Sequence, residues 1–434
     1  MNGRMRKLLL GLSPNVIWMG VVSFLNDLSS DMIFPFIPIF LTSVLGASLT
    51  FVGLVEGIAD ATASILKIVS GRISDRWQRR KPFVVFGYSL SALAKPILAA
   101  AMAPWHVLGI RFLDRVGKGM RDAPRDALIS FSTDRAAYGR AFGFHRGMDT
   151  LGAALGPLIA FTVLPFLGGN YRSLFLLSFV ASFLAVLILV AFVRETAMNG
   201  SQSPGMPSAP VGRPIDTDGL RPIVTDIRRE CATNPSTGSR TRWTMLGAPF
   251  FLFLAVATVA SLGKASEAFL ILKASDVGVA IILLPILYFV FNITSAVLAT
   301  PFGIVADRVG KRNTFVAGLI LFAAVYLGFA FFATPQTIWF LFIAYGVYAA
   351  LTEGVGRAIV AGLVPAEARA TAFGIYSAAT GLALLPASLV FGFVSQRFGS
   401  AWAFSYGAAL VLAAAVGFLF MGRITTRNRS TQVT

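Results

Sequence analysis

The chain has 434 residues, of which 56% are hydrophobic and only 13% are charged. Soluble domains carry about 25% charged residues, so this composition excludes an ordinary soluble protein and indicates a polytopic membrane protein. The formal net charge of +17 does not indicate nucleic-acid binding, because the basic residues stand mostly in short gaps between apolar runs. A single cysteine, Cys231, excludes an internal disulfide.

Twelve apolar segments are long enough to cross the hydrocarbon core, which requires about 20 residues. They are predicted at 14–43, 50–70, 83–102, 105–131, 141–166, 173–193, 244–272, 278–301, 314–333, 337–363, 371–396 and 401–422. A polar stretch rich in Ser, Pro and Gly divides them into six and six and predicts a flexible linker. We therefore expect an all-α integral membrane protein with these parts: a six-helix bundle over 1–193, a cytoplasmic linker over 194–243, a second six-helix bundle over 244–422 and a cytoplasmic tail over 423–434.

Lys and Arg are distributed unevenly over the gaps between the spans. One side of the membrane receives nearly all of them, and the other receives only Arg172, Lys273 and Arg397. Cytoplasmic loops carry the excess of basic residues, so both termini are predicted in the cytoplasm of a bacterial-type inner membrane. The first apolar segment is too long for a signal-peptide core, and we expect no cleaved signal.

Two loop motifs recur at nearly the same offset along the chain. GRISDRWQRRK at 71–81 follows the second span, and GIVADRVGKRN at 303–313 follows the eighth. RAFGFHRGMD at 140–149 opens the fifth span, and TAFGIYSAAT at 371–380 opens the eleventh. The shared offset indicates duplication of a six-helix unit, and many secondary transporters form a midplane binding site between such repeats.

The repeats and the six-plus-six arrangement resemble the major facilitator superfamily of secondary transporters over essentially the whole chain. The resemblance implies 12 transmembrane helices arranged as two pseudo-symmetric six-helix bundles. The family's loop motif, roughly G-x-x-x-D-R-x-G-R-R, is matched twice, with Gln78 replacing the second glycine of the first copy. The resemblance implies a charge lock on the cytoplasmic side, with these gating residues: Gly71, Asp75, Arg76, Arg80, Gly303, Asp307, Arg308 and Arg312. Positive-inside topology is the alternative explanation, but it does not require an aspartate at the same place in both copies.

The fourth predicted span contains an unusual number of charges, in RFLDRVGKGMRDAPRDALI at 111–129. Its charged residues recur at steps of three and four and therefore share one broad helix face. A charge that faces lipid costs about 2.5–3.5 kcal/mol at the bilayer centre on insertion scales. We therefore expect this face to line water or to meet partner charges on other helices.

Part of this segment is similar to the R-F-L-x-x-x-G form that the family places on helix 4, beside its central cavity. Arg111 and Gly117 match the form, whereas Asp114 and Arg115 depart from its usual Gln and Gly. The resemblance makes Arg111, and next Arg115, candidates for a midplane substrate contact. Residues 118–126 lie nearer the predicted cytoplasmic side, and there we expect an inner gate or a helix-end network.

Four acids in the first two spans are candidates for proton coupling. Asp27 and Asp31 are four residues apart, as are Glu56 and Asp60, so each pair lies on one helix face. Buried carboxylates that repel each other are costly to ionise and can take up protons. We expect Asp31 and Glu56 to be the main couplers. The alternative is that these acids permanently neutralise the arginines of the fourth span.

The other candidates lie in the fifth, seventh and tenth spans. The fifth span partly matches the G-x-x-x-G-P element of drug and metabolite antiporters of the family, at Gly152, Gly156 and Pro157. The later glycines of that element are missing, and small residues at this spacing also serve helix packing. Ionisable residues within spans predict further cavity positions: Asp149, Glu267, Glu353 and Arg357. Spacing allows Glu353 and Arg357 to form an ion pair along their helix, and Glu267 to pair with Lys264.

These observations predict a secondary active transporter that moves a small polar, anionic or zwitterionic solute by alternating access, coupled to protons and leaning toward export. A broad-range proton/drug or metabolite antiporter is the alternative within the family. A channel or membrane-embedded receptor is the alternative outside it, whereas an enzyme is disfavoured and the missing phosphate loop excludes an ATP-driven pump. We expect no cofactor, no metal site and no nucleic-acid partner. The expected state is a monomer in the lipid bilayer, with a small-molecule substrate and the proton as coupling ion.

Overall fold

The computed structural model describes residues 11–47, 49–196, 245–280 and 283–430. Every regular element in these ranges is helical, and each of the twelve predicted spans contains a helix. The main helices are α2 (Pro14–Ile33), α4 (Leu49–Trp77), α5 (Lys81–Ala99), α6 (Pro104–Phe131), α7 (Tyr138–Val163), α8 (Tyr171–Phe192), α11 (Gly247–Gly263), α12 (Glu267–Asp276), α13 (Leu284–Val309), α14 (Lys311–Phe331), α15 (Thr337–Leu363), α16 (Arg369–Phe398) and α17 (Ser400–Ser430).

Within the described ranges, nine helical segments are long and apolar enough to cross a membrane. Among the other main helices, α6 carries many charged residues, and α11 and α12 have only 17 and 10 residues. The fold is therefore that of an all-helical, multi-pass membrane protein, and the count of twelve spans stays a prediction.

The first predicted span, 14–43, is not one continuous helix. Ser13 caps the start of α2 by accepting a hydrogen bond from the Val16 backbone N–H at 3.4 Å. Pro35 and Pro38 have no backbone N–H to continue the helical ladder. The chain beyond α2 therefore proceeds in short helical turns, Phe34–Phe36, Ile37–Ile39 and Phe40–Val44.

The seventh predicted span, 244–272, is also interrupted, between α11 and α12. Lys264 has an extended backbone, with φ −91° and ψ 110°. The freed backbone N–H of Ala265 donates to the Tyr326 hydroxyl at 3.2 Å. Non-helical backbone inside a membrane requires such protein partners, and it commonly lines a cavity.

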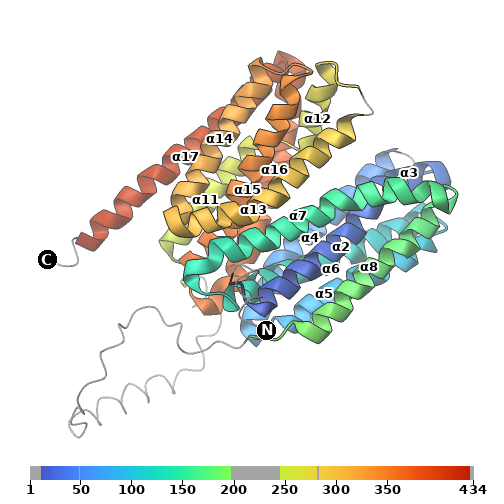
Figure 1. Cartoon of the computed structure of the whole chain (residues 1–434), viewed down its shortest axis with the longest axis horizontal. Helices are drawn as coiled ribbons and strands as arrows, with labels where there is room; N and C mark the ends of the chain where they lie inside the picture. The colour runs from blue at the N-terminus through green and yellow to red at the C-terminus, as the bar shows by residue number, and fades with distance from the viewer. Residues whose placement is uncertain (1–10, 48, 197–244, 281–282, 431–434) are drawn as a thin grey trace, which may run out of the picture.

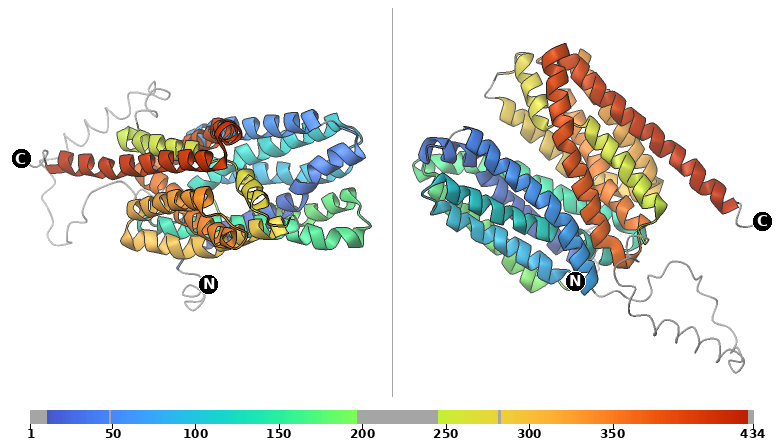
Figure 2. Two further views of the ribbon diagram at one scale, coloured as in Figure 1. Left: turned by 90° about the horizontal axis from the view of Figure 1, so that it is seen from above. Right: turned by 180° about the vertical axis from the view of Figure 1, so that it is seen from behind.

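The helices form two bundles, α2 to α8 and α11 to α17, which meet at one end and diverge toward α3 (Ile37–Ile39) and α12 (Figures 1 and 2). We call the end where they meet the linker side, because α8 ends there and α11 begins there. The main contacts between the halves join α7 to α13 and α4 to α16. Glycines permit these contacts, since Gly143 lies against the Ala299 carbonyl and Gly374 against the Lys67 carbonyl.

The outward faces of the helices present large apolar side chains, such as Phe161, Leu187 and Phe340. The charges of α6 are turned inward instead, and Arg111 and Arg121 are only 5% and 4% exposed. This distribution suits a surface in contact with acyl chains. The expectation that the charged face of α6 avoids lipid agrees with the structure.

Residues at the start of the predicted linker form hydrogen bonds, and part of the predicted tail is helical. The Asn15 side chain donates to the Arg194 carbonyl at 2.9 Å, and Glu195 accepts from the backbone N–H groups of Arg80 and Lys81 at 2.8–3.1 Å. Helix α17 continues to Ser430, through much of the predicted tail. Most of the predicted linker, residues 197–243, lies outside the described residues.

Candidate functional site

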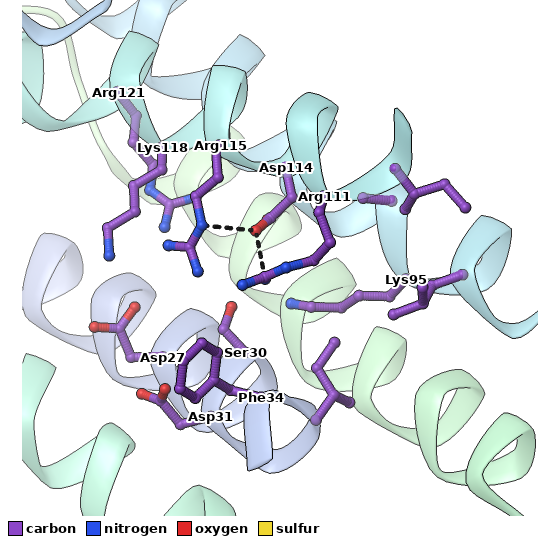
Figure 3. A pocket seen from close by; sticks show the side chains of 14 residues that line it. Asp27, Ser30, Asp31, Phe34, Lys95, Arg111, Asp114, Arg115, Lys118 and Arg121 are labelled. Atoms are coloured by element: carbon purple, nitrogen blue, oxygen red, sulfur yellow. Dashed lines mark hydrogen bonds and ion pairs between the residues drawn. The ribbon is translucent and has the colours of Figure 1, made fainter. Parts of the chain in front are cut away.

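A cavity of about 290 Å³ lies within the first half, between α2, α5 and α6 (Figure 3). Two of its walls carry opposite charges. The cationic wall is contributed by α5 and α6 and consists of Lys95, Arg111, Arg115, Lys118 and Arg121. The acidic wall is contributed by α2 and consists of Asp27 and Asp31. The predicted cavity residues Arg111 and Arg115 thus line an actual cavity.

The cationic wall is only partly neutralised by its own helix. The Asp114 carboxylate lies 3.5 Å from the Arg111 guanidinium and 3.9 Å from that of Arg115. The Arg121 guanidinium donates to the Ser91 hydroxyl at 2.9 Å and stacks over the Tyr88 ring at 4.4 Å. Asp114 therefore serves two arginines, and Asp122 of the same helix lies 3.9 Å from Arg121, so the five cations of the wall outnumber the carboxylates that α6 offers them.

The acidic wall faces these cations across the cavity (Figure 3). Asp27 accepts a hydrogen bond from the Asn26 side chain at 3.0 Å. Asp31 points into the cavity, and within the described part of the chain it forms no ion pair. The other predicted couplers, Glu56 and Asp60, belong to α4, but their side chains lie outside the described residues.

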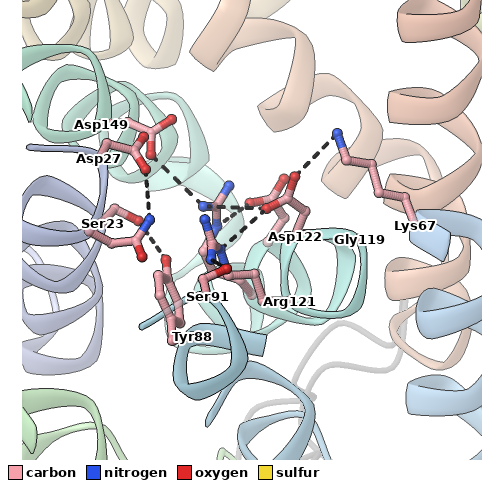
Figure 4. A network of polar contacts seen from close by, with 12 residues as sticks. Ser23, Asp27, Lys67, Tyr88, Ser91, Gly119, Arg121, Asp122 and Asp149 are labelled. Carbon is pink, nitrogen blue, oxygen red and sulfur yellow. Dashed lines mark hydrogen bonds and ion pairs between the residues drawn. The ribbon is translucent and has the colours of Figure 1, made fainter. Parts of the chain in front are cut away.

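Asp27 also lies beside Asp149 of α7 (Figure 4). Carboxylates only accept hydrogen bonds and repel each other, so a close pair is stabilised by a shared proton or by nearby cations. Asp149 is also bound by two cations, with Arg146 at 2.8 Å and Arg125 at 3.9 Å. Asp149, predicted as a cavity residue, therefore lies behind the acidic wall rather than on it.

A network of ion pairs extends from Asp149 into the second half. Arg146 binds Glu353 of α15 as well as Asp149. Glu353 also lies 3.9 Å from Lys264, at the break between α11 and α12. Arg146 and Glu353 thus join the two halves through their side chains.

A parallel bridge joins α6 to α15. The Arg357 guanidinium lies 3.1 Å from the Asp126 carboxylate, which is also 3.2 Å from that of Arg125. Lys67 of α4 pairs with Asp122 at 3.2 Å (Figure 4). Residues 118–126 therefore contribute mostly to an inter-helix network, and a role of this network as an inner gate stays a prediction.

A second cavity, of about 320 Å³, adjoins this network and is lined by both halves. Its charged lining residues are Lys67, Arg146, Lys264, Glu353 and Arg357. The expected pair of Lys264 and Glu267 forms, at 3.3 Å. Glu353 and Arg357, by contrast, take their partners from the first half instead of pairing along their own helix, which corrects that expectation.

The first loop motif joins α4 to the start of α16 on the linker side. The Asp75 carboxylate accepts hydrogen bonds from the backbone N–H groups of Ala370 and Thr371, at 3.3 and 2.7 Å, and from the Thr371 hydroxyl at 2.7 Å. Gly71 lies directly against the Ala370 carbonyl. A carboxylate at a helix N-terminus also meets the positive end of the helix dipole. We call this arrangement the first lock.

The second loop motif forms an equivalent second lock between α13 and the start of α7. The Asp307 carboxylate accepts from the backbone N–H groups of Gly139 and Arg140, both at 2.8 Å. Gly303 lies against the Gly139 backbone. Both aspartates therefore cap a helix of the opposite half, which topology alone would not require.

The basic residues of the motifs have different positions. Arg80 is buried, 3.9 Å from Asp75, and stacks over the Phe131 ring at 4.3 Å. Arg312 donates to the Phe418 and Leu419 carbonyls. Arg76 and Arg308 are exposed on the linker side, where they can face lipid head groups or water.

The sequence model of the Major Facilitator Superfamily matches the chain twice, over residues 19–270 and 251–433. The two matches together cover nearly the whole chain. The protein belongs to the major facilitator superfamily. It is therefore a membrane transporter of that family. Each of its halves contributes the aspartate of one lock, and each lock joins the two halves.

Known relatives extend the likeness along most of the transporter. An uncharacterized MFS-type transporter of Methanocaldococcus jannaschii is 33% identical over 416 residues, which cover 94% of this chain and 95% of that protein. The multidrug resistance protein MdtH of Photorhabdus laumondii is 34% identical over 128 residues, or 30% of this chain and 32% of that protein. The crystal structure of the human organic anion transporter MFSD10 superimposes with a TM-score of 0.72 at 16% identity, over 93% of this chain and 99% of that one.

The partial antiporter motif of the transporter serves helix packing. Gly152 lies against the Phe24 carbonyl and Gly156 against the Leu28 carbonyl, so α7 approaches α2 closely. Pro157 follows within α7. This contact also brings Asp149 of α7 to Asp27 of α2.

Some residues of the site were not among the sequence-based candidates, and Lys95 and Arg146 are two of them. Lys95 is a single charged residue in an otherwise apolar span, and Arg146 follows His145 at the start of the fifth span. The cost of an intramembrane cation was the signal that could have identified both. His145 is buried and forms a 2.8 Å hydrogen bond with Ser23.

Proposed function

We propose that this transporter moves a small polar solute, anionic or zwitterionic, by alternating access, that it is coupled to protons and that it favours export. The observation that carries the proposal is the cavity of the first half, with its cationic wall facing the acidic wall of α2. We further propose a monomer in a bacterial-type inner membrane with both termini in the cytoplasm. No enzymatic step is needed for this activity.

The charges of the cavity support a polar solute. Five basic and three acidic side chains line it, and ionisable groups in a membrane are retained where they serve a pathway or a ligand. A purely hydrophobic solute would leave these groups without solvation when it displaced water from the cavity. A solute with its own charges replaces that water by direct ion pairs.

The two locks support alternating access. Asp75 and Asp307 both hold the linker side closed, each by capping a helix of the opposite half. Rocking of one bundle against the other would break both locks together and expose the cavities to the linker side. Because the two motifs form equivalent contacts, both contribute to the free energy that favours the closed linker side.

The Asp27–Asp149 contact supports proton coupling. Arg146 binds both Asp149 of the first half and Glu353 of the second. A proton on the Asp27–Asp149 pair weakens the hold of Asp149 on Arg146 and leaves the guanidinium to Glu353, which favours closure of the linker side. Loss of that proton strengthens the pair within the first half and favours opening. Proton binding and gate position are thereby linked.

Proteoliposomes that enclose a pH-sensitive dye test the coupling. Addition of a transported anionic or zwitterionic solute should move protons in wild-type vesicles, and neither Asp27→Asn nor Asp149→Asn should do so. Counterflow of the same solute, which needs no net proton movement, should persist in at least the Asp27→Asn variant. Solute movement that is unaffected by a pH gradient would overturn the coupling, and absence of counterflow in the wild type would favour a channel or a receptor.

A second candidate is a broad-range proton/drug or metabolite antiporter. It is favoured by the similarity to the multidrug resistance protein MdtH over 30% of this chain. The two candidates differ in selectivity. An antiporter of broad range should exchange protons for lipophilic cations as well as for anions, whereas the first candidate should exclude lipophilic cations because of its cationic wall.

A further inference from the structure

Lys95 occupies an unusual position in the cavity of the first half. We propose that this cavity takes a small organic anion with two separate negative groups, such as a dicarboxylate, and that Lys95 is the residue that selects for the second group. The inference rests on the proposed function and specifies the class of its solute. It depends on the burial of Lys95, on its missing partner and on the surplus of cations around it.

The ammonium group of Lys95 is buried, and no described residue pairs with it. The residue is 2% exposed, and its Nζ has no hydrogen-bond partner in the part of the chain that the structure describes. Figure 3 shows the side chain reaching from α5 into the cavity, toward Arg111 and Phe34. A desolvated ammonium group with no acceptor is unfavourable, so the site is incomplete in this state. An anionic group of a bound solute would complete it.

The remaining charges of the wall do not supply that acceptor. Asp114 is shared by Arg111 and Arg115, at 3.5 and 3.9 Å. Asp27 accepts from Asn26 on the other side of the cavity, and Asp31 beside it forms no ion pair among the described residues. Within the same residues, Lys118 forms no ion pair either. Lys95 and Lys118 therefore have no negative partner in this state among the described residues.

The spacing of the cations favours two negative groups over one. One planar carboxylate can be saturated by a single guanidinium through two parallel hydrogen bonds. The cations of α6 extend from Arg111 to Arg121, which is roughly 15 Å along a helix axis. A single carboxylate bound at an arginine would still leave Lys95 unmatched, whereas a second negative group could reach it. The apolar neighbours Ile33, Leu98 and Ile110 limit water there and strengthen the ion pair.

Binding to the purified full chain in detergent tests the proposal. The probes are succinate and malonate as dianions with two separate carboxylates, acetate as a monoanion, glycine betaine as a zwitterion and choline as a cation. The dianions should raise the melting temperature more than acetate does, and betaine and choline should have little effect. Lys95→Met should weaken dianion binding by roughly 10- to 100-fold, as expected for loss of a charge-assisted hydrogen bond, and should affect acetate less.

The melting temperature of ligand-free Lys95→Met separates binding from folding. This variant removes a buried unpaired charge, so it should raise the melting temperature while it weakens dianion binding. A purely structural role would not move the two in opposite directions, and two further variants serve as comparisons. Lys95→Arg should retain the preference for dianions. Lys273→Met is the matched control, because Lys273 lies on α12 and donates to Ser400 at 3.1 Å, and it should leave binding unchanged.

The possible failures can be told apart. Equal binding of acetate and succinate, or stabilisation by betaine alone, overturns the dianion inference but leaves a proton-coupled polar-solute carrier in place. Absence of stabilisation by both dianions at millimolar concentration also overturns it. Failure of the proposed function itself would appear in the vesicle experiment, as a missing proton response to every solute that binds.

Discussion

Asp75 of α4 and Thr371 of α16 belong to opposite halves of the transporter and are joined by two hydrogen bonds of 2.7 Å, from the backbone N–H and the hydroxyl of Thr371. Asp307 repeats the relationship with Gly139 and Arg140. A carboxylate that receives several N–H groups at a helix start combines hydrogen bonding with the helix dipole. The closed linker side of this structure therefore depends on two carboxylates, and their removal gives sharp predictions.

Asp75→Asn should weaken the first lock, because the amide replaces one acceptor oxygen by a donor that faces backbone N–H groups. The expected cost to the closed state is about 1.5–3 kcal/mol. Spin labels at Trp77 and Val309, which are 65% and 63% exposed, report the separation of the two halves in a Cys231→Ser background. The distance distribution should broaden toward longer values. Arg76→Gln, at an exposed position, is the control, and the same broadening in that variant would contradict the assignment to Asp75.

Gly303→Ala should separate α13 from α7. A Cβ at Gly303 would overlap the Gly139 carbonyl, so the helices must move apart, at a cost of about 1–3 kcal/mol. Gly109→Ala is a matched control with the opposite expected sign. Its Cβ would meet nothing within 4 Å, and alanine favours a helix over glycine by up to about 1 kcal/mol. Thermal unfolding in detergent distinguishes the two, and equal shifts in both variants would rule out the steric account.

The Arg146–Glu353 contact should show energetic coupling between the halves. Arg146→Gln and Glu353→Gln should each destabilise the closed state, and the double variant should cost less than the sum of the two. The expected coupling energy is about 0.5–3 kcal/mol. The same spin-label distances, measured for the wild type and the three variants, complete the cycle. Strict additivity would show that the contact contributes nothing to closure.

Glu195→Ala should loosen the junction between α8 and the linker. Glu195 accepts from the Arg80 and Lys81 backbone N–H groups, which are otherwise unpaired donors at the start of α5. Loss of these contacts should cost about 1 kcal/mol. Amide hydrogen exchange in the first turn of α5 should rise, while exchange in the first turn of α8, capped by Asn170, should not change. Unchanged protection at Arg80 and Lys81 would contradict the capping role.

Much of the helical plan could be predicted because the bilayer imposes strict rules on composition. The many charged residues of α6 indicated that one face of this helix is turned away from lipid. In the structure, Arg111 and Arg115 of that face line a cavity. The interruptions at Phe34 and Lys264 were harder to predict, because hydropathy averages over a window and is insensitive to single backbone breaks. Pro35 and Pro38 were the signal that could have predicted the interruption at Phe34.

The partners of the charged residues could not be predicted from spacing. Arg146 and Glu353 are 207 positions apart in the sequence, and their contact depends on how the two bundles pack. Local spacing instead favoured a pair between Glu353 and Arg357, which does not form because each finds a partner in the first half. Lys95 was overlooked for a related reason, since a single cation in an apolar span acquires significance only when its surroundings are known.

The chemistry of the two locks bears on how freely this transporter can change over evolutionary time. On one side of each lock stands a carboxylate, but the other side consists mainly of main-chain amides, which every residue except proline provides. Mutations at Arg140 or Ala370 could therefore accumulate without abolishing the lock, whereas the two aspartates and the glycines beside them have no such latitude. The two halves could thus diverge in sequence while both keep the same carboxylate-to-backbone contact that closes the linker side.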